Sequence, residues 1–211
     1  MSRVHTSRTN LETIGRVIRA VSRRVLAHQE TRVFSKSILG AEAASPEDCE
    51  LVIVGPGDAQ GRETAEAAMV AAREPAGLVA QRLRRGDSFF GWQRERELVA
   101  FGWATSHQRR IAGTTLRPGP GRIFLYNFHT LPRFRGQGLY PSLLATMQHQ
   151  LHVDGATEFI IDVNSRNVSS LHGIRKAGFT LAARVTCLVF FRRWRVNLTR
   201  ELVDDSVRHL L

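Results

Sequence analysis

The stretch RFRGQGLYPSLL, Arg133 to Leu144, places two glycines within three residues and then continues with apolar residues at helical spacing. Residues 122–131, RIFLYNFHTL, precede it and have the aromatic and branched composition of a strand. A strand, a glycine-containing loop and a helix that starts near Pro141 leave amide groups free at the helix start, where the helix dipole adds partial positive charge. The stretch therefore predicts a backbone site for a phosphate or pyrophosphate.

The segments before this loop carry strand and helix patterns in turn. Pro75 must end one helix and suits the first position of the next, which Gly86 terminates. The Gly/Pro-rich residues 113–121 are predicted to form a loop. The predicted elements are a strand at 50–55, helices at 62–73 and 75–85, and a hairpin of strands at 88–94 and 98–106.

The segments after the loop alternate between helix and strand. A helix at 141–155 and a strand at 158–163 are followed by Asn167, whose side chain suits the cap of a helix that ends at Gly178. Residues 179–194 contain two more strand candidates. Antiparallel strands followed by the order strand, helix, strand, helix, strand predict a mixed α/β (α+β) fold in one domain.

The two ends of the chain are predicted to lie outside this domain. Thr9 and Glu12 form a capping box before apolar residues at helical spacing, which predicts an amphipathic N-terminal helix of about four turns. This helix either packs against the domain or lies on a membrane surface. We expect residues 1–45 to form a helical extension, 46–196 the domain, and 197–211 a tail whose helix docks on the body or on the second subunit of a homodimer.

The charge of the chain favours anionic partners. There are 30 Lys and Arg residues against 19 Asp and Glu, giving a formal charge of +11, and every basic residue except Lys36 and Lys176 is an arginine. The candidate partners are nucleic acid, acidic lipid and a phosphorylated small molecule. The arginines are spread along the chain rather than clustered with stacking aromatic residues, which argues against dedicated nucleic-acid binding.

The remaining composition indicates a cytoplasmic protein. Cys49 and Cys187 lack metal-ligand spacing and cannot build a framework of several disulfides, so we expect no metal site and a reducing compartment. The first residues, MSRVHTSRTN, lack the apolar core of a signal peptide. No apolar run approaches the roughly 20 residues that a membrane-spanning helix needs.

Two motifs resemble one family. TLPRFRGQGLYPSLL is similar to the acyl-coenzyme A loop of the GCN5-related N-acetyltransferases (GNAT), in which an apolar strand, a proline and R-G-x-G lead into a helix. NVSSLHGIRKAGF, Asn167 to Phe179, resembles the second signature of that family. The resemblance covers about two thirds of the chain, from Glu50 to about Trp194. It implies a central, mostly antiparallel mixed sheet of about six to seven strands flanked by helices.

The loop pattern R/Q-x-x-G-x-G/A fits the sequence in two registers. Arg133, Gly136 and Gly138 match every letter, whereas a start at Arg135 places Tyr140 at the last, small position. We prefer the second register because it also aligns the proline and the helix. The resemblance implies acetyl-coenzyme A as cofactor, with Arg135, Gly136, Gln137, Gly138, Leu139 and Tyr140 at the pyrophosphate and Thr130, Leu131 and Asn167 beside the pantetheine arm.

The family resemblance also implies a proton donor for the leaving thiolate, and here the sequence differs. The usual tyrosine lies seven residues after the asparagine, where this chain has Ile174, which cannot donate a proton. Tyr140 is the leading replacement. Its alternative role is to pack its ring against the loop or the following helix. Ser170 and His172 are weaker candidates on the same helix as Ile174.

The candidate base lies on the strand at 122–131. Alternation predicts Asn127 and His129 on one face and Tyr126 on the other. His129 titrates in a useful range and could accept a proton from an ammonium through water, and its alternative role is structural. Asp162 should face away from its apolar neighbours on the next strand, toward a helix or solvent.

Two hypotheses for the function follow from these features of the sequence. The first hypothesis is an N-acetyltransferase that uses acetyl-CoA and a small-molecule amine, and the R-G-x-G-L-Y-P variant resembles members that modify amino sugars of surface polysaccharides. Protein amino groups are an alternative acceptor. A second hypothesis, a non-catalytic acyl-CoA-binding or interaction module, follows from Ile174 and from the absence of a glutamate on the strand at 122–131.

Overall fold

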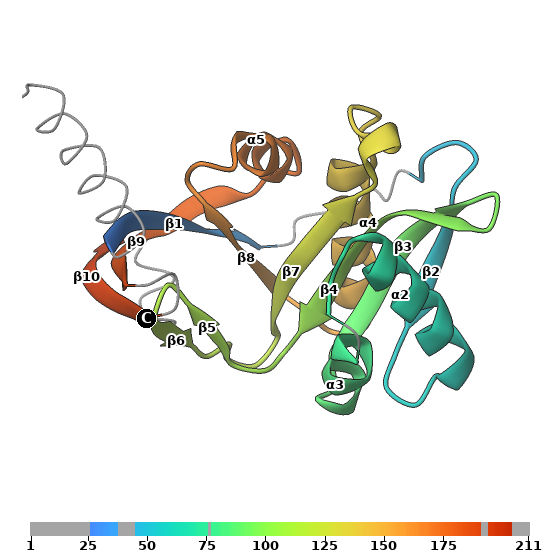
Figure 1. The fold of residues 1–211 in the computed structure, drawn as a ribbon, viewed down its shortest axis with the longest axis horizontal. Helices are drawn as coiled ribbons and strands as arrows, with labels where there is room; N and C mark the ends of the chain where they lie inside the picture. Colours follow the sequence, from blue (N-terminus) through green and yellow to red (C-terminus); the bar gives the residue numbers. More distant parts are fainter. Residues whose placement is uncertain (1–25, 38–44, 76, 191–193, 204–211) are drawn as a thin grey trace, which may run out of the picture.

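The computed structural model describes residues 26–37, 45–75, 77–190 and 194–203 (Figure 1). The predicted N-terminal helix lies outside these residues. The strands are β1 Leu26–Ser37, β2 Glu50–Val54, β3 Ser88–Arg94, β4 Glu97–Thr105, β5 Arg109–Ile111, β6 Thr114–Leu116, β7 Arg122–Thr130, β8 Glu158–Asn164, β9 Thr180–Phe190 and β10 Trp194–Leu202. The helices are α2 Ala59–Ala71, α3 Leu78–Arg84, α4 Leu139–Val153 and α5 Val168–Lys176, with a short 3-10 helix at Pro132–Phe134.

Eight of these strands form one mixed sheet in the order β10-β9-β1-β8-β7-β4-β3-β2, and β5 and β6 form a separate hairpin. All neighbours in the large sheet are antiparallel except β7 and β8. The parallel pairing of β7 and β8 runs from Arg122 opposite Glu158 to Leu125 opposite Ile161 and then stops. Beyond that point the two strands diverge, as Figure 1 shows.

The helices and the hairpin divide between the two faces of the large sheet. Met69 of α2 and Leu83 of α3 share a buried cluster with Trp103. The β5–β6 hairpin packs on the same face farther along, where strands β1, β8 and β9 contribute to a further cluster. Leu143 of α4 and Ile174 of α5 belong to the largest cluster, on the opposite face. The divergence of β7 and β8 therefore lies between two covered faces.

Most of the predicted elements are present. The strand at 50–55, the helix that ends before Pro75, the β3–β4 hairpin and the elements from β7 to α5 form where the sequence predicts them. Asn167 caps α5 as predicted, since its side chain accepts a hydrogen bond from the amide of Ser170. The mixed α/β fold is confirmed, and the large sheet has eight strands rather than six or seven.

The structure corrects four of the predictions. β1 was not predicted and lies within the segment expected to be a helical extension, yet it pairs with β8 and β9 near the middle of the sheet. Residues 197–202 of the expected helical tail belong to β10. The helix expected from Pro75 starts at Leu78, after Gly77 with a φ of 78°. The loop expected at 113–121 contains β6, because Ala112 and Gly113 make a tight turn from β5.

Candidate functional site

The loop between β7 and α4 exposes amide groups in the way that the sequence predicts. Gly136 and Gly138 have φ values of 80° and 75°, a region that favours glycine, and Gly138 is the N-cap of α4. Within the described part of the chain, the amides of Gly136, Gln137 and Gly138 have no hydrogen-bond partner. The first amides of α4 add to these donors. The space beside both glycines is open, so an anion can approach the backbone.

Arginine side chains hold this loop in place. The Nε atom of Arg135 donates to the carbonyl oxygen of Thr130 at 3.2 Å. Arg133 forms an ion pair with Glu97 of β4. An Nη atom of Arg94 donates to the side-chain oxygen of Gln137 at 3.3 Å. These contacts connect the loop to β3, β4 and β7.

A cavity of about 690 Å³ lies beside the loop, between β7, α4 and α5, and is called the smaller cavity below. Its lining includes most of the predicted cofactor residues: Thr130, Arg135, Gly136, Gly138, Leu139, Tyr140 and Asn167. Leu131 and Gln137 do not line it. The amide of Leu131 is already bonded to the carbonyl of Val99 at 2.9 Å, and Gln137 faces Arg94. His129 lines this cavity as well.

Asn167 stands at the edge of the smaller cavity, with one half of its amide group occupied. Its side-chain oxygen accepts from the amide of Ser170 at 3.2 Å and from the hydroxyl of Ser169 at 3.1 Å. Its NH₂ group has no partner among the described residues. That donor is free for a carbonyl group of a ligand in the cavity.

A β-bulge at Asn127 changes the faces of β7. Asn127 has a φ of 53°, and the three steps of β7 from Tyr126 to His129 lie opposite only two steps of β4, from Trp103 to Phe101. The ring of Tyr126 stacks near Trp103 and that of His129 near Phe101. Tyr126 and His129 therefore share a face, and the prediction of opposite faces was wrong because the bulge inserts one residue into the alternation.

A second cavity of about 940 Å³, the larger cavity, passes between the diverging strands β7 and β8. Residues of α3 and the β5–β6 hairpin line it on one face of the sheet, and residues of α5 line it on the other. It shares Phe128, Tyr140, Asn167 and Ser170 with the smaller cavity. The two cavities therefore meet at these four side chains.

Tyr140 occupies the junction of the two cavities. Its ring packs at 5.2 Å from the ring of Phe128 and lies directly against Gly173 of α5. Burial raises the pKa of its hydroxyl, so the hydroxyl stays protonated at neutral pH. No hydrogen bond to that hydroxyl occurs among the described residues. Ile174, where the family resemblance implies a tyrosine, is fully buried in the core.

His129 lines the smaller cavity and does not line the larger one. Its ring stacks at 5.5 Å from that of Phe101. Burial lowers its pKa, the positive charge of Arg135 lowers it further, and Glu74 partly offsets these effects. His129 is consequently neutral at physiological pH and can accept a proton.

Four arginines line the larger cavity, and none of them was singled out from the sequence: Arg82, Arg85, Arg109 and Arg110. Arg82 and Arg85 lie on and just after α3, and the other two lie on β5. The one carboxylate in the lining is Asp162, which points away from Ile161 and Val163 as predicted. Burial raises the pKa of Asp162, and the charge of Arg109 partly offsets this.

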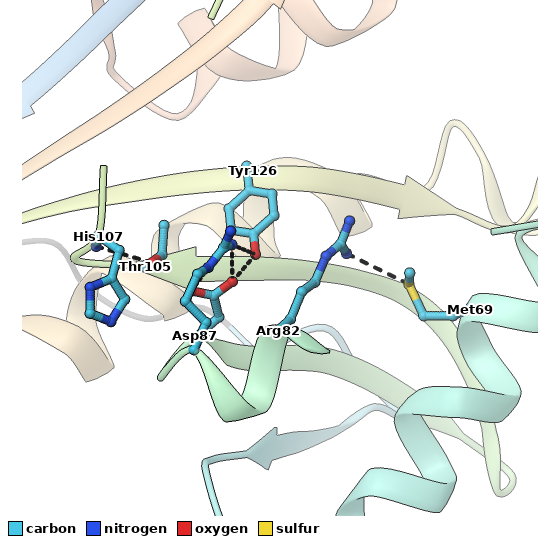
Figure 2. A network of polar contacts seen from close by, with 7 residues as sticks. Met69, Arg82, Asp87, Thr105, His107 and Tyr126 are labelled. Atoms are coloured by element: carbon cyan, nitrogen blue, oxygen red, sulfur yellow. Dashed lines mark hydrogen bonds and ion pairs between the residues drawn. The ribbon is translucent and has the colours of Figure 1, made fainter. Parts of the chain in front are cut away.

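The four arginines form one wall of the larger cavity and are called the arginine wall below. A network of buried polar contacts beneath this wall involves Asp87 and Tyr126 (Figure 2). Asp87 is fully buried and accepts hydrogen bonds from Arg85 and from the hydroxyl of Tyr126. Burial favours a higher pKa for Asp87, but the hydrogen bonds from Arg85, Thr105 and Tyr126 outweigh it, so the pKa lies below its ordinary value. Burial and the bond to Asp87 raise the pKa of Tyr126. The network holds a carboxylate and a neutral phenol in fixed positions.

The ring of Tyr126 supports two of the arginines. The guanidinium carbon of Arg109 lies 3.7 Å from the ring centroid, and that of Arg82 lies 5.2 Å from it. Burial lowers the pKa of both arginines. The charge of Arg109 lowers the pKa of Arg82 further, and the charge of Arg85 lowers that of Arg109 further. The only sequence signal for this wall was the excess of arginine, because its members come from segments far apart in the chain.

Other kinds of site are not found in the described ranges. No helix there is long and apolar enough to cross a membrane. No cluster of three or more His, Cys, Asp or Glu side chains there could hold a metal ion. Cys49 and Cys187 are not joined in a disulfide.

Comparison with known proteins gives one family and several similar folds. Residues 60–179 match the model of the acetyltransferase (GNAT) family. A GCN5-related N-acetyltransferase from Sphaerobacter thermophilus has a TM-score of 0.58 and 14% identity, over 86% of this chain and 58% of that one. A protein from Drosophila has a TM-score of 0.56 and 18% identity, over 85% and 58%. A putative GNAT acetyltransferase from Novosphingobium aromaticivorans has a TM-score of 0.54 and 18% identity, over 77% and 64%.

These similarities concern the fold, and they are partial on the side of the solved structures. The chain spans less than two thirds of the length of each of these three proteins. A search of curated protein sequences finds no match to the chain.

Proposed function

Since the matched residues 60–179 make up more than half of its 211 residues, the chain belongs to the GNAT acetyltransferase family, and we propose that it transfers an acetyl group from acetyl-CoA to the amine of a small molecule. The observation that carries this proposal is the meeting of two cavities at Tyr140, one bounded by free loop amides and the other opening through the sheet. One cavity suits the cofactor, and the other suits the acceptor.

The proposed cofactor site fits the donors that the chain presents. The amides of residues 136–138 and of the first turn of α4 would bind the pyrophosphate, at open glycines. The edge of β7 that faces β8 lacks a partner strand after Leu125, so its backbone groups are available to the amides of pantetheine. The NH₂ group of Asn167 is a further donor on the opposite wall.

Acetyl-CoA supplies the acetyl group as an activated thioester. Transfer forms a bond between the amine nitrogen and the acyl carbon and breaks the carbon–sulfur bond, while one proton leaves the nitrogen and one reaches the sulfur. The hydroxyl of Tyr140 is the proposed donor of the second proton, because it is protonated, has no other described partner and lies at the junction. Backbone amides of the free β7 edge are the proposed polarising groups.

We retain His129 as the proposed base, acting through water from the smaller cavity. Asp162 is a second candidate, because it is a half-buried carboxylate in the wall of the larger cavity and its pKa is raised by desolvation. We also retain an amino sugar as the proposed acceptor, on the similarity of the R-G-x-G-L-Y-P loop. The larger cavity, at about 940 Å³, is large enough for a sugar.

The specific observation that favours a non-catalytic acyl-CoA-binding module is Ile174, which is buried and cannot donate a proton. Calorimetry with acetyl-CoA, followed by thiol release with a panel of primary amines, distinguishes the two functions. We expect micromolar binding and amine-dependent thiol release. Binding without release from any amine supports the module instead.

Gly138→Glu tests the proposed cofactor site. The substitution puts a carboxylate at the start of α4 and a side chain at a φ of 75°, so it should abolish acetyl-CoA binding. Gly55→Ala is the matched control, since a Cβ at Gly55 meets no atom within 4 Å. Normal binding by the Gly138→Glu protein would contradict the proposed cofactor site.

A further inference from the structure

The larger cavity carries an excess of positive charge that the reaction itself does not require. Four arginines line it, against one carboxylate, Asp162. Asp87 lies behind the wall and is fully buried, with its bonds taken up by Arg85, Thr105 and Tyr126. The lining of the cavity therefore carries a net positive charge, which an acceptor with an amine alone does not match. Resting on the proposed transferase function, we infer that the acceptor carries a carboxylate or phosphate group that binds to Arg109 and Arg82.

Among the four arginines, Arg109 gives the strongest structural evidence for a bound anion. It lies on the β5–β6 hairpin, and its Nε atom is buried with no hydrogen-bond partner among the described residues. Its guanidinium carbon sits 3.7 Å from the centroid of Tyr126, so the ring fixes the group from one side. A buried donor without a partner costs free energy, and an anion in the cavity would satisfy it.

Arg82 approaches the same ring from α3. Its guanidinium carbon lies 5.2 Å from the centroid of Tyr126 and 4.9 Å from that of Trp103. Arg82 and Arg109 line the same cavity and lie over the same ring, so the two cations face a common space. Guanidinium groups bind carboxylate and phosphate oxygens two at a time, which makes such a pair selective for these anions.

The other charged residues that line the cavity differ in their contacts. Arg85 is committed to Asp87 and Tyr126, and Arg110 is exposed at the rim of the cavity. Asp162 is the one group of opposite charge in the lining and can receive the ammonium of the same acceptor. An acceptor with both an amine and an anion therefore matches the charges of the cavity on both sides.

The test compares amines in matched pairs: glucosamine with glucosamine 6-phosphate, and β-alaninamide with β-alanine. We expect thiol release from acetyl-CoA with a kcat/KM at least tenfold higher for one or both of the anionic members than for their neutral counterparts. Arg109→Gln should reduce that preference at least tenfold, mainly through KM, and Arg109→Lys should retain part of it. Arg184→Gln, an exposed arginine paired with Glu201, is the matched control and should keep the full preference.

Two results overturn the inference. One is the absence of a preference for the anionic member in both pairs. The other is an anionic preference that persists unchanged in both Arg109→Gln and Arg82→Gln. A response to glucosamine 6-phosphate alone assigns the wall to phosphate, and a response to β-alanine alone assigns it to carboxylate.

A binding measurement separates this inference from the transferase proposal. In the Gly138→Glu protein the loop should not bind phosphate, so calorimetric titration of that protein with inorganic phosphate and with acetate, with and without Arg109→Gln, reports binding to the arginine wall. We expect saturable binding of at least one anion, weakened at least tenfold by Arg109→Gln added to Gly138→Glu. Absence of binding of both anions overturns the inference. Binding here with no acetyl-CoA binding by the unsubstituted protein would keep the anion site and reject the transferase.

Discussion

The ring of Tyr140 fills the space that a side chain at Gly173 would need. A Cβ atom built at Gly173 would lie 2.6 Å from Cε1 of Tyr140, closer than any real Cβ contact. The ring also packs against Phe128, so the only open space into which it can move is that of the two cavities that it lines. The position of the tyrosine at the junction of the two cavities therefore depends on a glycine in the neighbouring helix.

Gly173→Ala should displace Tyr140 and destabilise the fold. We expect the free energy of unfolding to fall by about 1 to 3 kcal/mol, the usual cost of overpacking, and thiol release to fall with it. The loss of stability should largely disappear in a Tyr140→Ala background, which chemical denaturation of the four proteins measures. Gly55→Ala serves as the control and should cost nothing, and a Gly173→Ala protein as stable as the parent would contradict the packing.

Tyr140→Phe removes only the hydroxyl. If the hydroxyl protonates the leaving thiolate, kcat should fall about 100-fold or more, while the affinity for acetyl-CoA stays unchanged. Because burial holds its pKa above the ordinary value of 10, kcat should show no alkaline loss from this group below pH 10. Steady-state kinetics and calorimetry measure both quantities.

The chain's only other tyrosine supplies the comparison for that experiment. Tyr126→Phe deletes the bond to buried Asp87 and should lower the free energy of unfolding, which Tyr140→Phe should not do. An unchanged kcat in Tyr140→Phe removes the hydroxyl from the mechanism and leaves the ring with a packing role.

Asp87→Asn should reduce stability at neutral pH and remove a pH dependence at acid pH. The folded pKa of Asp87 lies below the ordinary value of 3.8, so its ionised form stabilises the fold above that pH. That contribution is lost as the pH falls from about 3.8 through the folded pKa. We expect a loss of about 3 kcal/mol at pH 7, since Arg85 and Tyr126 lose their buried partner.

Urea unfolding at pH 7 and at several values below pH 4 checks this prediction. The parent protein should lose stability over that acid range more steeply than the Asp87→Asn protein. Asp154→Asn, at an exposed position after α4, should follow the parent at every pH. Parallel curves for the parent and Asp87→Asn would show that Asp87 does not titrate in the predicted direction.

The assignment of the base rests on the direction of the pKa of His129. Burial and Arg135 hold this pKa below 6.5, so NMR titration of its imidazole should give a midpoint under that value, and Arg135→Gln should raise the midpoint. If His129 is the base, His129→Gln should remove the corresponding acid limb of kcat/KM. Loss of the limb in Asp162→Asn instead would transfer the role to Asp162.

The sequence predicted the elements whose local signals agree with their packing. The loop from Gly136 to Gly138 could be read because left-handed glycines and a following helix define a phosphate site locally. β1 could not be read in the same way. Thr31 and Ser35 are buried in it beside Val33 and Phe34, so its burial depends on its neighbours in the sheet and not on an apolar pattern of its own.

The arginine wall was beyond sequence reasoning for a related reason. Arg82 and Arg109 come from different elements, and only the return of the β5–β6 hairpin across the sheet face brings them to one ring. The turn at Ala112 and Gly113 that makes this return has φ values of 48° and 86°, and its glycine was interpreted as part of a loop. The face of Tyr126 was also missed, because alternation alone cannot reveal a bulge at Asn127.

The opening between β7 and β8 has a consequence for the order of events. The smaller cavity lies by α4 and α5, whereas the arginine side of the larger cavity lies by α3 and the hairpin, on the opposite face of the sheet. If the smaller cavity binds acetyl-CoA and the larger one binds the acceptor, as proposed above, each substrate enters from its own face of the sheet and neither blocks the other. Entry from opposite faces of the sheet to a shared junction would favour direct transfer with both substrates bound together. Each product could then leave through the cavity by which its substrate entered.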